Sequence, residues 1–568
     1  MKRVLPLTWA AVLSVLMLGP ALAPGFVLIR DMVWVPNLAM HRDVLGLGSA
    51  LPRAVPSDAV VAILDEVVPG MLLQKLVLLG ALVGAGTGAA ALVRSGLVVR
   101  LVAVSVAIWS PFVVERLAIG HWPMLLGYAA VPWLAVAGRR VAAEQVVPVW
   151  TPFVLLAGSL SANAGLVSAA VLLVTGMAGG VRRRSTGLLM AMVVAANAPW
   201  LVAGLAHTTA AADAGGFRIF ATAGHGLPAP LAVLTLGGIW NSDVAAGRGG
   251  VLGWAAAALV VGLAALGARD WWRAQGRRQG VALIVLWTLG VAIALLSWAA
   301  PQTLAAVGGA VPGLGLLRDG SRSLALAMPL TVGLVAAGAG VLAGLPRAPI
   351  ARAALAVALV LAPVAVLPEA SWGRGGELRA VHYPAEWLAA TGEVGTTHGD
   401  ALVLPWSAYR APAWNNGRPV LDPLNRLLPV AVVSDGDLVV GATTVRGEDP
   451  RAAQAHAALA LPSPQARADA LRAIGIGWVL VEKDARGSAE PVAGRAVHDG
   501  PLLRVARLVG TVHEQPVARG RVIAQLLAWA AFLALLLVGV VISMRRAYSG
   551  VATWRAWAAT LWPTGKRE

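Results

Sequence analysis

The feature that most constrains this chain of 568 residues is a repeated alternation of long apolar stretches with short loops rich in arginine. A helix needs about 20 mostly apolar residues to cross a bilayer, so the pattern predicts an α-helical polytopic membrane protein with about twelve transmembrane helices. The predicted spans are residues 5–29, 71–93, 96–114, 120–138, 147–161, 164–180, 186–206, 250–268, 280–299, 323–344, 350–367 and 521–544.

The distribution of charge orients these spans. If the N-terminus is cytoplasmic, every arginine cluster between spans falls on the cytoplasmic side, as the positive-inside rule requires. The clusters are Arg94/Arg100, Arg139/Arg140, Arg182–Arg184, Arg269/Arg273/Arg277/Arg278, Arg347/Arg352 and Arg545/Arg546. Of the acids, only Glu144, Asp270 and Glu568 fall on that side. We therefore expect a multi-pass protein of the bacterial inner (plasma) membrane with both termini cytoplasmic.

The first apolar stretch also fits a cleaved signal peptide, because Lys2 and Arg3 precede it and Ala21-Leu22-Ala23 resembles a cleavage site. The apolar run continues to Ile29, which favours a retained span. Cleavage would leave the acid that follows, Asp31, on a free chain end.

Composition narrows the class of function. The sequence is 58% apolar and has 64 glycines, which is typical of membrane helices in close contact. The net charge of +17 comes mainly from the short inner loops, so we do not expect nucleic acid as a partner. The absence of cysteine excludes disulfides and thiolate metal sites. No nucleotide-binding lysine motif, zinc-protease motif or dinucleotide fingerprint is present.

Three parts are expected along the chain. Residues 1–367 form a transmembrane body that holds all but the last span and an outer loop at 30–70. Residues 368–520 form an extracytoplasmic α/β domain, and residues 521–568 form the final transmembrane helix and a cytoplasmic tail. Apolar runs predict short strands at 401–405, 476–482 and 502–508, and proline at the first turn predicts helices at 450–461 and 464–474.

Asp31 is the first candidate for chemistry, since it directly follows the first span on the predicted outer side. An acid beside lipid is costly and usually has a function, although here it can also mark the interface and pair with Arg30. His41, Arg42 and Asp43 follow in the same loop. They either converge with Asp31 or form a solvated turn.

Glu115, Arg116, His121 and Trp122 lie together in the next outer loop. Three ionisable groups at one outer helix end would line any cavity there. The alternative is a surface pair beside an ordinary aromatic residue of the membrane interface.

Arg318, Asp319 and Arg322 precede a later span on the same side. Two arginines four residues apart near a helix start can bind a phosphate, helped by free backbone N–H groups. The alternative is that both arginines pair with Asp319 or with lipid headgroups.

The α/β domain carries aromatic and amide side chains close together in sequence. Such a set is typical of a surface that stacks on sugars, but packing in the domain core explains the tryptophans equally well. The candidates for acceptor binding are Trp406, Tyr409, Trp414, Asn415 and Asn416.

With these segments placed, the chain resembles GT-C-type membrane glycosyltransferases and is similar to the actinobacterial envelope arabinosyl- and mannosyltransferases. The resemblance covers most of the chain. It rests on the acid after the first span, the Gly-His-Trp-Pro turn at 120–123, the Leu-Arg-Asp-Gly-Ser-Arg segment at 317–322 and the late outer domain.

The resemblance implies a polyprenyl-phosphate sugar donor and an inverting transfer to an envelope glycan or glycolipid at the outer face. It places Asp31 at the first-loop acid that acts as base. Many members carry two neighbouring acids there, whereas in this chain Asp43 is well downstream. The base assignment and a dependence on a divalent metal therefore stay open.

The residues support a mechanism of the same kind. Asp31 would take the proton of an acceptor hydroxyl, and Arg318 and Arg322 would stabilise the departing lipid phosphate, with Arg116 or His121 as helpers. Two other classes remain: a lipid or polysaccharide transporter, which should carry polar residues at mid-membrane depth, and a non-catalytic scaffold that binds envelope glycans.

Overall fold

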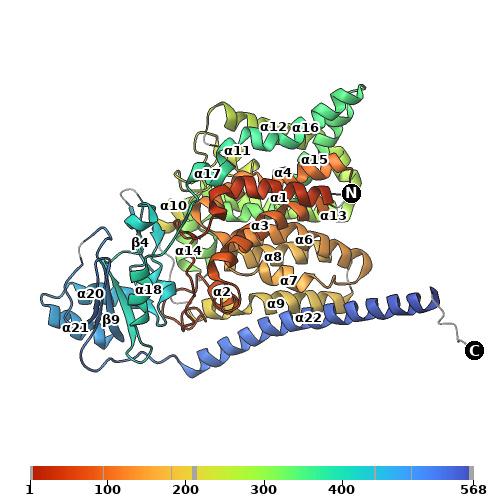
Figure 1. Ribbon diagram of the computed structural model, residues 1–568. Helices are drawn as coiled ribbons and strands as arrows, with labels where there is room; N and C mark the ends of the chain where they lie inside the picture. The colour runs from red at the N-terminus through yellow and green to blue at the C-terminus, as the bar shows by residue number, and fades with distance from the viewer. Residues whose placement is uncertain are drawn as a thin grey trace, which may run out of the picture.

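A computed structural model describes residues 4–561 apart from Arg94, Val181, 208–213, Arg248, Pro312, 441–442 and Ser488. The predicted cytoplasmic residues Lys2, Arg3 and Arg94 and the end of the predicted tail, 562–568, lie outside the described residues. Long helices form most of the molecule, and a smaller sheet-containing part lies at one end of them (Figure 1). We call residues 4–366 together with the last helix the helical body, and residues 380–507 the sheet domain.

Among the described residues, eight helices are long and apolar enough to cross a membrane, which confirms a multi-pass membrane protein. A ninth is possible if η3 (Gly320–Leu326) and α15 (Met328–Gly344), which meet at 56°, form one bent span. The eight are α1 with η1 (Val4–Leu22), α3 (Gly70–Leu92), α4 with α5 (Leu97–Ile119), α9 (Arg183–Leu205), α12 (Gly250–Gln275), α13 (Arg277–Ala299), α16 (Pro349–Val366) and the first part of α22 (Arg519–Leu561).

The predicted number of about twelve spans is not confirmed. The spans expected at 120–138, 147–161 and 164–180 correspond to α6 (Trp122–Glu144), α7 (Thr151–Ala157) and α8 (Ala162–Met177). Helix α7 has only seven residues, too few to cross a bilayer as a helix. The shorter helices elsewhere are α2 (Ser57–Leu64), α10 (Ala214–Ile219), α11 (Ala229–Leu234), α14 (Pro301–Ala310), α17 (Ser371–Gly376) and α19 (Leu424–Leu427).

The sheet domain is built on a mixed sheet with the strand order β10-β11-β9-β3-β6. Strand β3 runs parallel to β6 and β9, and β11 is antiparallel to both of its neighbours. The strands are β3 (Asp400–Leu404), β6 (Val432–Val433), β9 (Ile476–Glu482), β10 (Arg495–Asp499) and β11 (Leu503–Arg507). Helices α18 (Ala385–Gly392), α20 (Pro450–Leu459) and α21 (Pro464–Ala473) accompany them.

The three strands and two helices predicted in this region are confirmed. Helices α20 and α21 begin at proline, and the side chains of Asp449 and Ser463 accept hydrogen bonds from the first turns. An apolar core continues from the helical body into the base of this domain, and a second core, with Leu402 and Leu471, packs the sheet against α20 and α21.

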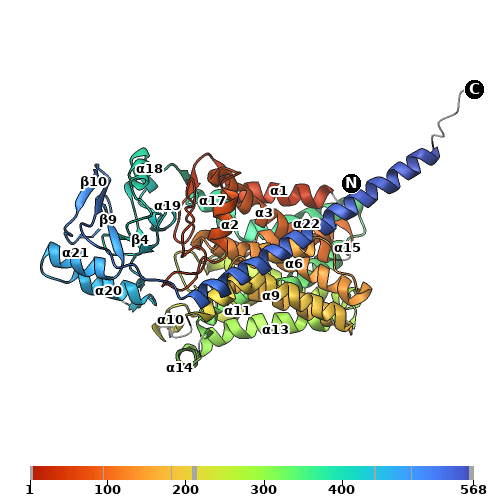
Figure 2. The same ribbon diagram turned by 90° about the horizontal axis from the view of Figure 1, so that it is seen from below.

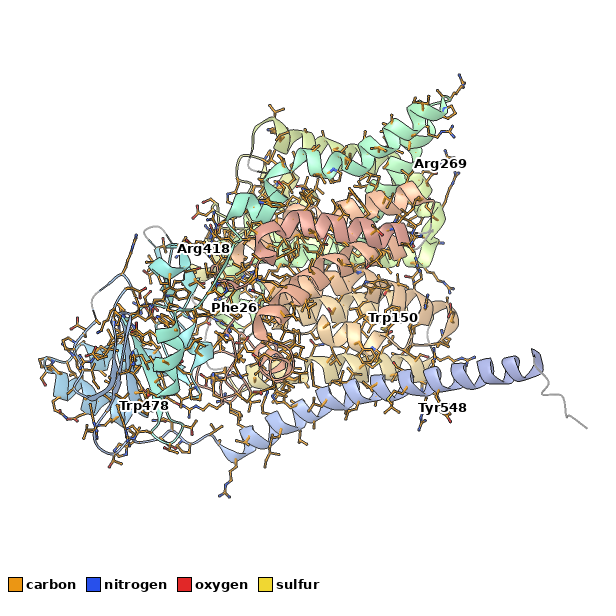
Figure 3. The ribbon with its side chains drawn as sticks, in the orientation of Figure 1. Phe26, Trp150, Arg269, Arg418, Trp478 and Tyr548 are labelled. Carbon is orange, nitrogen blue, oxygen red and sulfur yellow. The ribbon has the colours of Figure 1, made fainter. Side chains whose placement is uncertain are left out.

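The first loop after α1 joins the helical body to the sheet domain. Strand β1 (Phe26–Val27) pairs with β2 (Ala380–Val381), and Figure 3 shows Phe26 at this junction. The hydroxyl of Tyr383 donates to the carbonyl of Trp34 over 2.9 Å. Two further hairpins are β4 (Tyr409–Arg410) with β5 (Val420–Leu421) and β7 (Leu438–Val440) with β8 (Thr443–Val445).

The start of α1 and the far end of α22 lie on the same side of the helical body. Figures 1 and 2 place both at the end opposite the sheet domain, and α22 runs beside α9. An even number of membrane crossings is needed for this arrangement. Which end faces the cytoplasm remains a prediction from the arginine distribution.

Candidate functional site

Asp31 lies on a tight turn that both parts of the molecule hold. Arg30 has a positive φ of 46°, which is uncommon for a residue with a side chain, and its carbonyl accepts a hydrogen bond of 2.7 Å from the N–H of Leu421 in β5. The guanidinium of Arg30 forms an ion pair of 3.0 Å with Glu377. The N–H of Asp31 donates to the carbonyl of Ile119 at the end of α5 over 3.1 Å. The turn is therefore fixed from several sides.

Gly120 allows this close approach. It ends α5 with a φ of 91°, and a Cβ added there would lie 2.1 Å from the backbone nitrogen of Met32. The helix therefore stops directly beneath the Asp31 turn. His121, the next residue, is aimed at the Asp31 carboxylate as a result.

Both carboxylate oxygens of Asp31 have hydrogen-bond donors. His121 Nε2 lies 2.9 Å from Oδ2, and the hydroxyl of Tyr409, in β4 of the sheet domain, donates to Oδ1. Burial alone would raise the pKa of Asp31, but His121, Tyr409 and the charge of Arg322 hold it below its usual value. The side chain still keeps 36% of its exposure, so a ligand can reach the carboxylate.

The tautomer of His121 follows from its neighbours. A guanidinium only donates, so the contact of 3.2 Å from Arg116 to Nδ1 makes that nitrogen the acceptor. The proton then resides on Nε2 and points at Asp31. Burial and the charge of Arg322 lower the pKa of His121, which favours the neutral ring. In this tautomer the approach of Arg322 to Nε2 at 3.4 Å is a packing contact.

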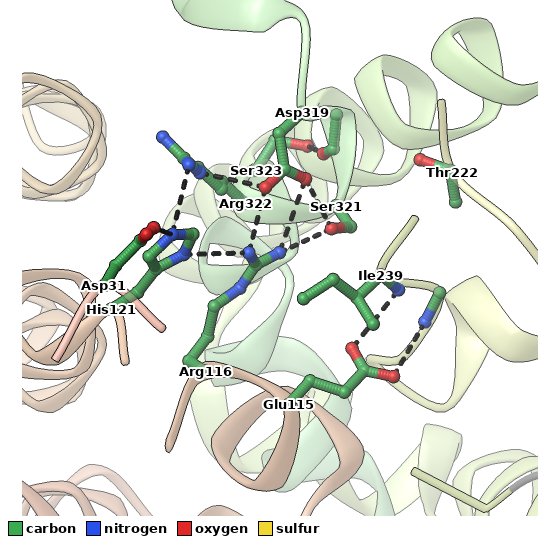
Figure 4. A network of polar contacts seen from close by, with 12 residues as sticks. Asp31, Glu115, Arg116, His121, Thr222, Ile239, Asp319, Ser321, Arg322 and Ser323 are labelled. Atoms are coloured by element: carbon green, nitrogen blue, oxygen red, sulfur yellow. Dashed lines mark hydrogen bonds and ion pairs between the residues drawn. The ribbon is translucent and has the colours of Figure 1, made fainter. Parts of the chain in front are cut away.

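Behind His121 is a buried ion group that we call the body cluster: Arg116, Asp319 and Arg322 (Figure 4). The carboxylate of Asp319 lies 2.9 Å from each guanidinium, and it also accepts a hydrogen bond of 2.7 Å from Ser321. Burial would raise the pKa of Asp319, but the two arginines hold it far below its usual range. Two guanidinium groups share one carboxylate, so the cluster keeps a surplus positive charge beside Asp31.

Arg318 and Arg322 do not share an α-helical turn. Arg318 ends η2 (Leu314–Leu317), while Arg322 lies in η3, and Asp319 between them has φ −93° and ψ 83°. Arg318 pairs with Glu448 of the sheet domain at 3.3 Å and covers the ring of Phe220 at 4.9 Å. Burial, together with the charge of nearby Arg53, lowers the pKa of Arg318 to about 10.

Glu448 also binds Arg53 of the first loop, at 2.9 Å. Sequence reasoning missed both residues. Neither belongs to a motif, and 395 positions separate them in the chain. The sequence carries no local signal for this contact.

Two predicted residues of the second outer loop point away from Asp31. The carboxylate of Glu115 accepts backbone N–H groups of Gly238 and Ile239, both at 3.3 Å, and Figure 4 shows it on the far side of α5 from His121. Trp122 is 4% exposed and packs against Trp34 at 5.0 Å. In this structure Glu115 therefore fixes the loop around 237–246, and Trp122 belongs to the core.

The His41, Arg42 and Asp43 triplet lies at a different contact. Arg42 binds Asp400 at the start of β3, and Asp400 also pairs with Arg451 at 2.7 Å. The triplet therefore links the first loop to the sheet domain away from the Asp31 network.

Of the five candidates for acceptor binding, Tyr409 is the one that contacts Asp31. Trp414 packs between Tyr383 and Trp387, and buried Asn415 donates to the carbonyl of Leu28 over 3.2 Å. Asn416 is exposed in a turn with φ 57°, and Trp406 is partly buried near His456.

A metal site is not evident in the part of the chain that the structure describes. No three side chains among its His, Asp and Glu residues come together as ligands. The Asp31 network places a reachable carboxylate beside guanidinium charge, an arrangement suited to removing a proton and binding an anion.

Comparison with solved structures identifies the fold. The chain is similar to arabinofuranosyltransferase AftD from mycobacteria, with a TM-score of 0.55 and 17% identity over 90% of this chain. A mutant form of AftD matches with a TM-score of 0.50 and 15% identity over 90% of this chain. The chain spans 40% and 42% of the lengths of these two solved chains.

No protein-family model matches the sequence, and no curated protein gives a significant match. The structural likeness, at its low identity, concerns the fold. It agrees with the predicted fold, a helical membrane body with a strand-containing region near the C-terminus.

Proposed function

We propose that this protein is a membrane glycosyltransferase that moves a sugar from a polyprenyl-phosphate donor to an envelope glycan or glycolipid at the extracytoplasmic face. The observation that carries the proposal is the state of Asp31. Its carboxylate is oriented through both oxygens, is ionised at neutral pH and is still reachable. The fold shared with an arabinofuranosyltransferase supports glycosyl transfer as the class of reaction.

Asp31 acts as the general base in this proposal. As the acceptor hydroxyl attacks the anomeric carbon, Asp31 takes its proton, and the bond from that carbon to the phosphate oxygen breaks with its electron pair going to the phosphate. His121 and Tyr409 keep the carboxylate in one orientation through the step. Inversion at the anomeric carbon follows from this single displacement.

The surplus charge of the body cluster suits the leaving group. Arg322 keeps 32% of its side-chain exposure, whereas Arg116 is fully buried, so Arg322 is the member that can meet a phosphate. His121 lies between Arg322 and Asp31, which separates the base from the leaving group. Arg318 is a second candidate, although Glu448 is its partner in this structure.

The transporter alternative finds less support. Gln74 and Lys75 are polar residues in α3, but Gln74 exchanges two hydrogen bonds with the backbone of Val27, at 2.9 and 2.8 Å, and Lys75 donates to Gln74. These contacts hold the start of the first loop against α3. A glycan-binding scaffold, in turn, has no need of a carboxylate held like that of Asp31.

The test is Asp31→Asn, assayed for transfer from a polyprenyl-phosphate sugar in a purified membrane preparation. The amide keeps the shape but is no useful base, so the rate should fall about 100- to 10,000-fold while protein abundance and donor binding persist. Glu66→Gln is the matched control, an exposed acid of the same loop, and should retain activity. An Asp31→Asn rate within a few-fold of the wild type would remove Asp31 from the mechanism.

A further inference from the structure

The first turn of α8 places a polar side chain, Asn163, against the outer loop before α15. Ser161 caps this helix, because its side chain accepts a hydrogen bond from the N–H of Ala164, and the cap fixes the turn in which Asn163 lies. One end of the Asn163 amide is 2.9 Å from the carbonyl oxygen of Leu316 in η2, and the other end is 2.9 Å from a terminal nitrogen of Arg322 in η3.

The two neighbours assign the orientation of this amide. A carbonyl oxygen only accepts hydrogen bonds, and a guanidinium only donates them. The amide nitrogen of Asn163 therefore faces Leu316, and the amide oxygen faces Arg322. In this orientation both ends of the amide are hydrogen-bonded, whereas the reverse orientation would set each end against a group of its own kind.

The amide spans the segment that carries the acid of the body cluster. Asp319 lies between η2 and η3, with φ −93° and ψ 83°, so the chain is not helical at this point. Asn163 contacts the segment on both sides of that break, at Leu316 and at Arg322. Since η3 also packs against α13, the backbone of η3 is held by one helix and the side chain of Arg322 by another.

Arg322 has one neighbour at each of its three nitrogens. Its Nε donates to Asp319 over 2.9 Å, one terminal nitrogen donates to Asn163, and the other packs against Nε2 of His121 at 3.4 Å (Figure 4). Each terminal nitrogen carries two N–H groups, so donors remain that none of the described residues accepts. The side chain is 32% exposed, and a ligand that reaches it meets a guanidinium already fixed in one plane.

Asn163 holds Arg322 without cancelling its charge. A carboxylate at this position would accept the same hydrogen bond, but it would bring a second negative charge to a cluster of two guanidinium groups and one acid. The surplus positive charge beside Asp31 would then be lost. A neutral amide gives the orientation and keeps the charge.

We infer that Asn163 is a positioning residue, which holds the guanidinium of Arg322 in the orientation that meets the donor phosphate. The inference rests on the proposed function, since it needs Arg322 to bind that phosphate. Asn163 acts through Arg322, so its loss weakens recognition of the phosphate group and leaves contacts with the lipid chain unchanged.

The test measures the binding of a short-chain prenyl phosphate, and of the matching prenol, to the detergent-solubilised full chain by titration calorimetry. Asn163→Ala should weaken binding of the phosphate about tenfold and leave the prenol unchanged, because a hydrogen bond to a charged group is lost. Asn163→Asp should weaken it at least as much, because the added charge offsets that of Arg322. Both variants are first checked by melting, and Asn163→Ser replaces the alanine variant if that one does not fold.

A double variant separates positioning from general damage to the fold. Asn163→Ala combined with Arg322→Ala should bind prenyl phosphate about as weakly as Arg322→Ala alone, because Asn163 has no guanidinium left to hold. Full addition of the two losses would overturn the inference, and so would wild-type binding of prenyl phosphate by Asn163→Ala.

Asn197→Ala is the matched control, a second amide with both ends bonded in the helical body. The nitrogen of Asn197 donates to the carbonyl of Val193, and its oxygen accepts from the indole of Trp200, both at 2.8 Å. Its loss should lower the melting temperature and leave the binding of prenyl phosphate as in the wild type. An equal loss of binding in this control would reduce Asn163 to a structural residue.

The proposed function can fail separately from this inference. If Asp31→Asn transfers sugar normally while Arg322→Ala and Asn163→Ala both lose prenyl phosphate, the base assignment is wrong and the role of Asn163 stands. If Arg322→Ala binds prenyl phosphate as the wild type does, the phosphate role of Arg322 and the positioning role of Asn163 are both overturned.

Discussion

Two buried ion groups of similar size lie on either side of the Asp31 turn, and they have opposite ratios of arginines to acids. The body cluster has two arginines and one acid. In the sheet domain, Arg410 lies 2.7 Å from Glu482 and 3.3 Å from Asp422, and we call these three residues the domain cluster. It has one arginine and two acids, all of them at most 2% exposed.

The protonation of the acids differs accordingly. The pKa of Asp319 in the body cluster is held far below its usual range. In the domain cluster, burial raises the pKa of both Asp422 and Glu482, and a single guanidinium does not offset it for two carboxyl groups. The domain cluster therefore retains a proton, whereas the body cluster remains fully ionised.

The two clusters differ in whether a substrate can reach their charge. The body cluster has one member, Arg322, that is partly exposed beside Asp31, so its surplus charge can act on a substrate. The domain cluster is sealed and joins β4 to β9, directly next to Tyr409. In our proposal the first cluster does chemistry and the second holds the tyrosine in place.

The strongest test of this contrast is Asp319→Asn. Removing the only carboxylate leaves Arg116 buried without its counter-charge, which typically costs about 3–5 kcal/mol. We expect a large drop in melting temperature at neutral pH. Because the folded pKa of Asp319 is lowered, its stabilisation is present above the ordinary carboxyl pKa and is lost only in acid.

The control for Asp319→Asn is Asp499→Asn, since Asp499 pairs with Lys483 at the surface and should contribute little. Equal melting of both variants would contradict the importance of the body cluster. The comparison needs no substrate.

Arg322→Ala should lower transfer more than Arg318→Ala. Arg322 is the partly exposed member of the body cluster and lies next to His121, whereas Arg318 is held by Glu448 and covers the ring of Phe220. Losing one hydrogen-bond donor to the charge that develops on the leaving group lowers the rate about 100-fold or more. Arg322→Lys should restore the rate only partly, because lysine keeps the charge but lacks the bidentate guanidinium. The measurement is the donor dependence of the rate, with folding checked by melting. An unchanged donor requirement in the double variant would make both arginines structural.

Features that depend on residues close together in the sequence could be predicted from it. Apolar length and arginine position predicted the helical membrane body, and short apolar runs predicted β3, β9 and β11. The number of spans was less accessible, because a short helix such as α7 has the hydropathy of a crossing without its length. Hydropathy does not report where a helix breaks.

Most of the site was predicted as residue types without their partners; the pair of Arg322 with Asp319, given as an alternative, is present. Arg116, His121, Asp319 and Arg322 do converge with Asp31, but Arg116 and Asp319 are 203 positions apart. Tyr409 was chosen for its ring, while its hydroxyl, 378 positions from Asp31, makes the contact. Such pairs depend on the packing of the sheet domain on the helical body, which no local pattern encodes.

Glu482→Gln should act on stability with the opposite pH dependence to Asp319. A raised folded pKa means that the contribution of Glu482 is fully present below the ordinary carboxyl pKa and is lost as pH rises through the folded pKa. In acid the variant should therefore have about the same melting temperature as the wild type. In alkali it should melt at a higher temperature, because its free energy of unfolding is larger by about 1 kcal/mol or more. A uniform loss at every pH would show that the domain cluster needs both acids.

Tyr409→Phe should have the smallest effect, and it tests whether the two clusters meet at Asp31. Asp31 works as an anion, so the rate rises with pH as it ionises. Without the Tyr409 hydroxyl the ionised form loses a donor, the pKa of Asp31 rises and the acid limb of the pH–rate profile moves to higher pH. Above that limb the rate should stay within a few-fold of the wild type, because His121 still orients the carboxylate.

Tyr383→Phe is the control, since its hydroxyl donates to the carbonyl of Trp34 and its loss should lower stability without moving the acid limb. An unmoved acid limb in Tyr409→Phe would mean that the sheet domain does not set the base, and the domain cluster would then serve folding alone.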